Sequence, residues 1–470
     1  MTLPTRPPAY CPHLEQLEDR MLLDAYTFTL IHDADNHGAF APSLNAQGTA
    51  AFVWNPSVRD SNIETGDGGA LTTVLNCLFC SFGRSAPAIN ERGAVAFFAS
   101  FGVDPPVKGV NNGVFRYDAD GLTLLAGDGP GSPFNDFGPR DMPVPAINAT
   151  GTVTFFATLA GGDSGIFTTS DGKTYTTIAS TGDRFSELGT APAINADGTV
   201  AFWARLADGG SGIFTVTDGV ITPVADTAGG YFSSFGDAPS LNNAGTVAFF
   251  ATFSGGSGIF TGDGADLDPI ATTGRHFTDF DPVPSVNNDG TVAYLAQLRD
   301  GRRAIFTSTG GPVIATGDLL FDGTVSSLRF FRQGLNDVDS VGFWALVGNE
   351  SRVVRADVAS SGHVRHADAV ALFHEASLEK GPFLIVGRDG MPFSDSEPAI
   401  DVFVESGRDQ GSDVRSGRTA VALIGSPGVD ERFLRRWSRP ATQSGQQLQE
   451  LPPVGPQTWL GGERILLDYE

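Results

Sequence analysis

The stretch PAINADGTVAFWA, from Pro192 to Ala204, decides the fold because six other stretches of the chain are built in the same way. In each copy a small and an aliphatic residue precede an asparagine, and an apolar run follows. An aromatic residue stands seven positions after the asparagine, as Phe202 does after Asn195. The seven asparagines are Asn45, Asn90, Asn148, Asn195, Asn242, Asn287 and Asn336. Their spacings of 45, 58, 47, 47, 45 and 49 residues are typical of four-stranded propeller blades.

Within one copy the sequence predicts four strands joined by tight turns. Asn195 and Gly198 suit a turn, because asparagine bonds to its own backbone and glycine tolerates positive φ. The second strand is expected at 199–206, the third at 212–217 and the fourth at 220–226, with glycine-rich hairpin turns between them. We interpret the repeated asparagines as turn residues rather than as repeated ligand contacts.

The pattern of the second strand distinguishes a propeller from a sheet that has one solvent-exposed face. Val200, Phe202 and Ala204 point to one side, and Ala201 and Trp203 point to the other. Both sets are apolar, and a strand that is apolar on both faces must be covered on both faces. Blades stacked around an axis provide this cover. The sequence therefore predicts an all-β fold, a seven-bladed propeller at residues 25–358.

The last blade lacks a fourth strand, and the first strand of the chain has no partner nearby in sequence. Tyr26 to His32 alternates as a strand does and resembles the fourth strands of other blades. We predict that it completes blade seven and closes the ring, which removes an exposed sheet edge. Residues 362–369 are the competing segment for this position.

Composition limits the partners. The 470 residues carry a formal net charge of −24, from 54 acidic and 30 basic side chains. This balance argues against nucleic acid as a partner and favours a self-repelling chain that we expect to be a monomer. No apolar run is long enough for a membrane span. Three cysteines are too few for a disulfide framework.

The two ends of the chain depart from the repeats. LEQLEDRMLLD, Leu14 to Asp24, resembles a Leu-Glu-x-Leu-Glu-x-Arg-x-Leu-Leu segment that begins many large bacterial surface proteins. This resemblance implies export, an extracellular or cell-surface location, and a targeting or processing role for residues 1–24. A short amphipathic helix is the alternative. Residues 359–470 are expected to be a loosely ordered extension, or a small second domain, with strands at 382–386 and 399–404.

The repeats as a whole resemble TolB-type propeller repeats over residues 42–358. In both, a proline-led turn with glycine leads to an Ala-Phe strand and then to an Ile-aromatic strand. Asparagine stands here in place of the usual serine, and Asp339 replaces the glycine of the last copy. The resemblance implies a propeller that binds proteins or glycans, and it carries over no catalytic residue.

A second repeat lies in the segments that lead into each first strand, which we expect to be loops. Two large apolar residues stand three apart there, as Phe185 and Leu188 do, and acidic residues lie beside them. Such loops usually surround one mouth of the central channel, and an acidic mouth suits a cationic or polyhydroxylated ligand. The candidate binding residues are Asp136, Glu187, Asp237, Asp279 and Asp281.

Other motifs give weaker indications. Cys77 and Cys80 have redox-motif spacing without a thioredoxin-like context, so a packed thiol pair or a local disulfide is expected. The acidic turns at 118–121 and 263–268 lack calcium-loop spacing. His363 and His366 have no glutamate between them that would suit a zinc protease. We therefore expect no metal site.

Neither a nucleophile elbow nor a nucleotide-binding loop is present, and we expect no cofactor. The sequence thus favours a non-enzymatic, exported or surface-associated binding or scaffold propeller, with a glycan or protein ligand at the channel mouth. A hydrolase or lyase that acts on an extracellular polysaccharide with acids from several blades is the alternative. A cation-stabilised structural module is the third.

Overall fold

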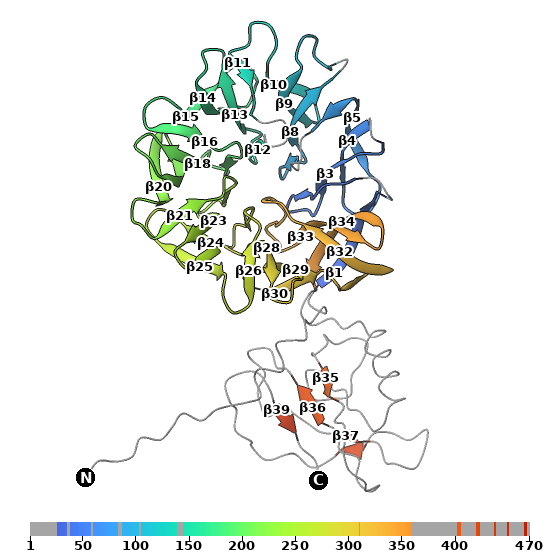
Figure 1. The fold of residues 1–470 in the computed structure, drawn as a ribbon. Coiled ribbons are helices and arrows are strands. Elements are labelled where there is room, and N and C mark those ends of the chain that lie inside the picture. Colours follow the sequence, from blue (N-terminus) through green and yellow to red (C-terminus); the bar gives the residue numbers. More distant parts are fainter. Residues whose placement is uncertain are drawn as a thin grey trace, which may run out of the picture. The chain divides into compact units, whose positions relative to one another are not determined.

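The computed structural model describes residues 26–359, apart from 35–37, 58–59, 83–86, 103–104, 139–143 and 310, and five short strands between 402 and 467. The chain divides into two compact units, 1–358 and 359–470. The described part of the first unit consists of seven sheets arranged as blades around a common axis (Figure 1). The predicted all-β, seven-bladed propeller is confirmed.

The second and third strands of each blade form its antiparallel centre. In blade four the pair Phe202 and Phe214 lie directly opposite each other. The second strands are β3 (Ala50–Trp54), β8 (Val95–Phe101), β13 (Val153–Leu159), β18 (Val200–Leu206), β23 (Val247–Phe253), β28 (Val292–Leu298) and β33 (Val341–Val347). The third strands are β4 (Asp60–Gly66), β9 (Asn112–Asp118), β14 (Ser164–Thr169), β19 (Ser211–Thr217), β24 (Gly256–Gly262), β29 (Arg303–Thr307) and β34 (Glu350–Val358).

The inner strand of a blade is built from two segments that pair with opposite ends of the second strand. In blade four, Leu188 pairs with Ala204, whereas Ile194 pairs with Val200. The segments that carry the asparagines are β2 (Ser43–Leu44), β7 (Ala88–Ile89), β12 (Ala146–Ile147), β17 (Ala193–Ile194), β22 (Ser240–Leu241) and β27 (Ser285–Val286). In blade seven a single bridge, Leu335 to Val341, takes this place.

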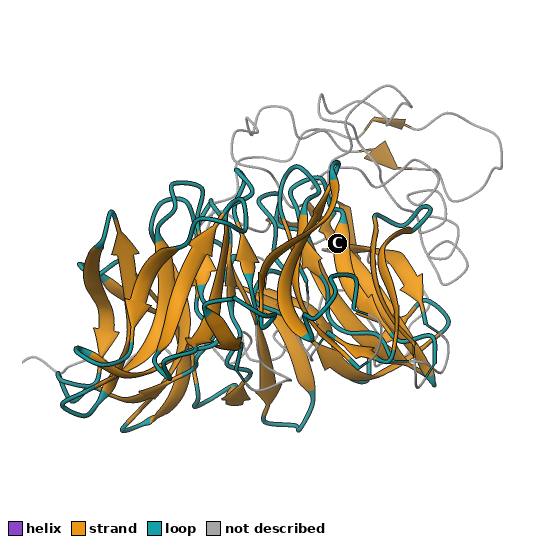
Figure 2. Cartoon of the chain, turned by 90° about the horizontal axis from the view of Figure 1, so that it is seen from above, coloured by secondary structure: helices purple, strands orange, loops and turns teal. Residues whose placement is uncertain are grey.

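The preceding segments, expected to be loops, are strands, so that expectation was wrong. They are β6 (Cys80–Ser81), β11 (Phe134–Asp136), β16 (Phe185–Leu188), β21 (Phe232–Phe235), β26 (Phe277–Phe280) and β32 (Gly323–Arg329), the last of which forms a hairpin with β31 (Leu319–Leu320). The physical reason lies in their two large apolar residues, which reach the blade core only when the segment pairs with the second strand. Because the two segments pair with opposite ends of the second strand, the asparagine turns lie at one face of the ring and these segments at the other. Figure 2 shows the strands of the ring from the side, with loops at both faces.

The N-terminal strand closes the ring, as predicted. β1 (Tyr26–Asp33) pairs antiparallel with β34, from Tyr26 opposite Val358 to Asp33 opposite Arg352. It thereby supplies the fourth strand of blade seven (Figure 1). The competing segment, 362–369, lies outside the described residues. The other fourth strands are β5 (Thr72–Leu78), β10 (Gly121–Gly127), β15 (Thr176–Ser180), β20 (Val220–Asp226), β25 (Leu267–Thr272) and β30 (Gly311–Ala315).

Aromatic side chains fill the blades. In blade four, Phe185, Phe202 and Phe214 from three adjacent strands place their ring centroids 5.2 to 6.0 Å apart. All three rings are almost completely buried. Edge-to-face and offset contacts at this spacing stabilise a core beyond the area that they bury. The repeat thus places one such aromatic core in each of blades two to six.

The second unit is described only in its strands. These are β35 (Val402–Glu405), β36 (Ala420–Leu423), β37 (Trp437–Ser438), β38 (Gln449–Glu450) and β39 (Ile465–Leu467). β35, β36 and β39 form one sheet, and β37 pairs with β38. β35 overlaps the strand expected at 399–404. The strand expected at 382–386, the histidines at 363 and 366, and the N-terminal segment 1–24 lie outside the described residues.

Candidate functional site: the central channel

The seven repeated asparagines form a closed ring of hydrogen bonds around the channel. Each side-chain Nδ2 donates to the backbone oxygen of the asparagine in the next blade, and Asn336 donates to Asn45. The donor–acceptor distances are 3.4 Å (Asn45 to Asn90), 2.9 Å (Asn90 to Asn148), 3.2 Å (Asn148 to Asn195), 3.2 Å (Asn195 to Asn242), 3.0 Å (Asn242 to Asn287), 3.1 Å (Asn287 to Asn336) and 2.9 Å (Asn336 to Asn45).

The other half of each amide holds its own turn. Asn195 Oδ1 accepts from the backbone N–H of Thr199 at 2.9 Å, and Asn195 is only 5% exposed. The glycine of the turn has positive φ in six copies, and Asp339 takes the same conformation in the seventh with φ of 59°. The structural interpretation of the asparagines is confirmed. What the sequence did not indicate is that one side chain serves its turn and the neighbouring blade together.

A second, partial collar lies just outside this ring, at the residue after each asparagine. The backbone N–H of Ala196 donates to Asn243, that of Asn243 to Asn288, and that of Asn288 to Asp337, at 2.8 to 2.9 Å. Glu91 accepts from Ala46 in the same way at 2.9 Å. Burial raises the pKa of Glu91, and Asp337 adds to the rise. This mouth therefore carries amides and two carboxyl groups.

The buried side chain of Arg332 blocks the central channel. Its side chain is 1% exposed, and it extends from blade seven to the carbonyl groups of blades three, four and five. Nη1 donates to the oxygens of Ala191 at 2.9 Å, Pro192 at 2.8 Å and Pro239 at 3.3 Å, while Nη2 donates to Val144 at 3.1 Å. Buried arginine normally has a carboxylate partner. None of the ion pairs between described residues includes Arg332.

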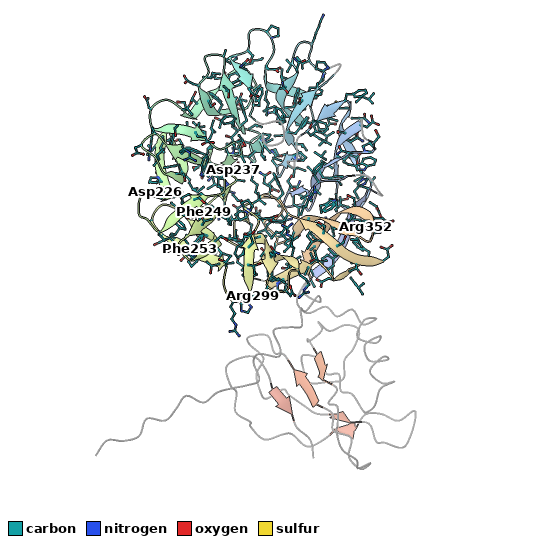
Figure 3. The ribbon with its side chains drawn as sticks, viewed as in Figure 1. Asp226, Asp237, Phe249, Phe253, Arg299 and Arg352 are labelled. Carbon is teal, nitrogen blue, oxygen red and sulfur yellow. A yellow bond between two sulfur atoms is a disulfide. The ribbon has the colours of Figure 1, made fainter. Side chains whose placement is uncertain are left out.

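Burial lowers the pKa of Arg332 to about 10, and the field of Asp237 opposes this fall. The guanidinium is therefore charged at neutral pH. Carbonyl dipoles from three blades stabilise it, and Asp237 contributes from a distance. Figure 3 labels Asp237 close to the centre of the ring, whereas Asp226 lies at the outer edge.

Between Arg332 and the asparagine ring lies a cavity of about 180 Å³. Its wall contains the aliphatic residue that precedes each asparagine, one from every blade. These residues are Leu44, Ile89, Ile147, Ile194, Leu241, Val286 and Leu335. Arg332 and Gln333 line the deep end, and Glu91 and Asp337 line the mouth. The channel thus contains a small chamber whose wall combines these aliphatic side chains with asparagine and serine residues and whose floor is cationic.

The acidic residues singled out from the sequence lie on the other side of the ring. Asp136, Glu187 and Asp279 occupy equivalent exposed positions on β11, β16 and β26. Glu187 forms an ion pair with Arg205 at 3.2 Å. Asp136 and Asp279 each accept a hydrogen bond from the backbone N–H of the next residue, at 2.7 and 2.9 Å. Blades three, four and six thus each carry one carboxylate at this position, whereas blade five has Ser234 there.

The remaining two candidates are in different environments. Asp237 is exposed and lies two residues before Pro239, where the inner strand changes direction toward the channel. Asp281 is half-buried and pairs with Arg303. Burial raises the pKa of Asp281, Arg303 lowers it, and the charge of Asp279 raises it further. Asp279 and Asp281 are thus the two candidates whose charges interact.

Sequence reasoning missed Arg332, although the repeat contained the signal. Four residues before the asparagine, six blades carry a small apolar residue: Ala41, Ala86, Val144, Ala191, Ala238 and Val283. Blade seven carries Arg332 at this position, and Gln333 replaces the proline that follows. Aligning the copies on their asparagines identifies a large cation in a column of small residues. Only the closed ring shows that this column faces the axis.

Blade one contains a second departure from the repeat. Trp54 replaces an alanine, Asn62 the glycine of blades two to five, and Glu64 the third-strand phenylalanine of blades two to six. These side chains share one face through the pairs Phe52–Glu64 and Trp54–Asn62. The ring of His32 from β1 lies 4.6 Å from that of Trp54. Trp54 Nε1, Asn62 Oδ1 and Glu64 Oε2 are buried without a hydrogen-bond partner. Burial raises the pKa of Glu64. The sequence analysis did not single out this cluster.

The remaining sequence motifs have structural roles. Cys77 and Cys80 form a disulfide at the junction of β5 and β6, so a local disulfide, one of the two alternatives, is confirmed. Asp118 and Asp263 bond to backbone N–H groups within their own turns. Over the described residues, no group of three or more His, Cys, Asp or Glu side chains is arranged to hold a metal ion. The same residues include no helix with the length and apolar character that a membrane crossing requires.

Comparisons with known proteins give one family model and several solved structures. The model of a family described as "Family of unknown function (DUF7453)" matches residues 33–223. No curated protein matches. A prolyl endopeptidase structure is 14% identical, with a TM-score of 0.45 over 84% of this chain and 56% of that one, so this chain spans little more than half its length.

Two further solved structures are similar at a lower level. A gluconolactonase from Xanthomonas campestris is 12% identical, with a TM-score of 0.33 over 71% of this chain and 99% of that one. The six-bladed fucose-binding lectin of Aleuria aurantia is 12% identical, with a TM-score of 0.33 over 59% and 94%. At such identities the likeness concerns the fold alone, and function must come from the residues. The chain is a seven-bladed β-propeller, with a partial match to a family whose function is unknown.

Proposed function

We propose that this protein is a non-enzymatic, exported or surface-associated propeller that acts as a binding or scaffold module. The observation that carries the proposal is the repeated acidic position on one face of the ring. Asp136, Glu187 and Asp279 stand at the same exposed position of the same inner strand in three blades. An array of equivalent carboxylates around a channel suits a polyhydroxylated or cation-bearing polymer, such as a glycan or a basic protein segment.

Export is supported by the bond between Cys77 and Cys80. Disulfides persist in oxidising compartments and are rare where thiols are kept reduced. The bond closes a loop of four residues, so removing it lowers the free energy of unfolding by about 2 kcal/mol in the chain-entropy model. Protein isolated from its native host and unfolded without reductant should contain one titratable thiol, that of Cys11. Three titratable thiols would remove this support.

A binding screen tests the leading function. The full chain is applied to a glycan array and to a panel of basic peptides, and hits are measured by calorimetry. The triple variant Asp136→Asn, Glu187→Gln, Asp279→Asn retains side-chain size and hydrogen-bonding oxygens but removes three charges. We expect it to lose most of the affinity while its melting temperature changes little, because all three side chains are exposed. Unchanged affinity in this variant would place the ligand elsewhere.

A hydrolase remains the second candidate, and Asp279 with Asp281 is the observation that favours it. Two neighbouring carboxyl groups are what glycoside hydrolysis requires, and burial raises the pKa of Asp281. Arg303 already pairs with Asp281, however, and both acids come from one blade. Polysaccharide turnover that disappears in Asp281→Asn, with the fold retained, would establish the enzyme and overturn the binding proposal.

A further inference from the structure

The floor of the central cavity contains hydrogen-bonding groups that the protein leaves unmatched. Arginine has five N–H donors. In Arg332, Nη1 serves three carbonyl oxygens and Nη2 serves one, whereas Nε has no partner. Gln333, the next residue, also lines the cavity, and its Oε1 is buried without a partner. An unmatched donor on a cation and an unmatched acceptor therefore occur side by side in the chain and in the cavity.

Leaving such groups unpaired costs free energy, so a guest that pairs with both would be bound favourably. The guest must accept hydrogen bonds from a guanidinium and donate one to an amide oxygen. A carboxylate accepts from guanidinium with matching geometry, and a neighbouring hydroxyl supplies the donor. The fixed charge of Arg332, without an ion-pair partner, attracts an anion to the low-dielectric end of the channel.

Size restricts the guest further. A dry protein cavity of roughly 150 Å³ holds one benzene molecule. The chamber of about 180 Å³ therefore has room for a molecule of a similar number of atoms. Its aliphatic wall, one residue from each blade, suits a short hydrocarbon portion. A polymer or a nucleotide is too large for this chamber.

We propose that Arg332 and Gln333 bind a small α-hydroxycarboxylate at the floor of the central cavity. The carboxylate accepts from the guanidinium, and the α-hydroxyl donates to Gln333 Oε1. The ligand enters past the asparagine ring. Gln333 is only partly buried and, like Arg332, lines the cavity. This inference goes beyond the proposed binding function, because it concerns the opposite face of the ring from the acidic array and a different class of ligand.

Calorimetric titration of the full chain with L-lactate, propionate and lactamide tests the proposal. Propionate lacks the hydroxyl and lactamide lacks the charge. We expect lactate to bind, and each analogue to bind about 10- to 100-fold more weakly, the range of one hydrogen bond to a charged group. Absence of saturable lactate binding, or equal affinity for all three, would overturn the proposal and would point to water as the occupant of the floor.

Variants assign the binding to the two residues. Gln333→Met keeps the side-chain length and should reduce lactate affinity to that of propionate. Arg332→Gln should abolish lactate binding; since it also removes donors from several blades, circular dichroism and thermal melting must confirm folding. If Arg332→Gln does not fold, Gln333→Met and the analogue series still test whether lactate binds at this site. Gln297→Met, at an exposed position of β28 outside the cavity, makes the same change of side chain as Gln333→Met and is the matched control; it should leave lactate affinity unchanged. Loss of lactate binding in the control, or its retention in Gln333→Met, contradicts the assignment.

Failure of this inference is distinguishable from failure of the proposed function. The acidic array is tested with polymers and with charge-neutral variants on its own face. A protein that binds glycans but not lactate keeps the binding function and loses the small-ligand site. A protein that binds lactate and also hydrolyses a polysaccharide keeps the small-ligand site and loses the non-enzymatic binding function.

Discussion

Replacement of Asn195 by alanine tests whether the asparagine ring holds the blades together. The side chain donates to Asn242 O at 3.2 Å and accepts from Thr199 N–H at 2.9 Å. Alanine leaves this N–H unmatched, and Thr199 is only 8% exposed. It also removes one of the two donors to Asn242 O, which keeps the backbone N–H of Gly245 at 3.2 Å. An unmatched buried donor costs about 1 to 3 kcal/mol and a lost hydrogen bond about 0.5 to 1.5 kcal/mol, so the free energy of unfolding should fall by about 2 to 4 kcal/mol.

The adjacent turn position supplies a matched control. Asn243 also joins two blades, because its Oδ1 accepts from Ala196 N–H at 2.9 Å, but it is exposed. Water replaces that bond, so Asn243→Ala should cost less than about 1 kcal/mol. Asn195→Asp distinguishes the two halves of the amide. It keeps the acceptor for Thr199 but places a carboxylate against the oxygen of Asn242, so it should recover stability when acid protonates it.

Equilibrium urea unfolding, followed by tryptophan fluorescence and far-UV circular dichroism, measures these differences. Coincident curves from both probes are needed before a free energy is assigned. The reasoning is refuted if Asn195→Ala is no less stable than Asn243→Ala. It is also refuted if Asn195→Asp is as stable as the parent at neutral pH, since the inter-blade donor would then be dispensable.

Three further changes test the core, the blade-one cluster and ring closure. Burial raises the pKa of Tyr294 to about 12, so the folded state keeps the phenol proton while the unfolded state loses it near pH 10. Between these pH values the free energy of unfolding of the parent should therefore fall by about 2 to 3 kcal/mol more than that of Tyr294→Phe. Urea unfolding at a series of alkaline pH values measures this difference. The raised pKa of Glu64 acts in the same direction at lower pH, because burial disfavours the ionised carboxylate: Glu64→Gln should be more stable than the parent at pH 7, and the difference should shrink as the pH falls and protonates Glu64. A Gln variant that is less stable than the parent at pH 7 would show that the contacts of the ionised carboxylate outweigh the cost of its burial. Deletion of residues 1–41 removes β1, so it should abolish the cooperative melting transition, which deletion of 359–470 should leave in place; a cooperative transition in the first deletion would show that another segment closes blade seven.

Much of the architecture could be predicted from the sequence because the repeat constrains it at every level. The spacing of the repeats, their turn residues and their strands that are apolar on both faces all indicate a propeller. A fold can be predicted from sequence when such independent features agree. The orphan strand at Tyr26 could be assigned because one blade lacked a fourth strand. The segment around Phe185 was misread as a loop because a strand with a bulge and two exposed middle residues has no clean alternation.

The candidate site was less predictable, and the reason is geometric. Position in a repeat shows that Asp136, Glu187 and Asp279 are equivalent, but not that they lie on the face opposite the asparagines. Arg332 stands out in its column, yet its partners are carbonyl groups of blades three to five, more than 90 residues away in sequence. Trp54, Asn62 and Glu64 likewise become one cluster only through strand register. Such contacts depend on closure, which no local pattern records.

The direction of the asparagine bonds has a consequence for how this protein could have arisen. Every repeat carries a donor for the blade after it and an acceptor for the blade before it, so a single duplicated unit already contains both sides of its joint. Such head-to-tail joints are self-propagating and stop only when the curve returns to its start. The Asn336–Asn45 hydrogen bond therefore joins the last repeat to the first and closes the ring. Moving the chain termini to any other gap between blades should yield the same circle, because the joint has no preferred first member.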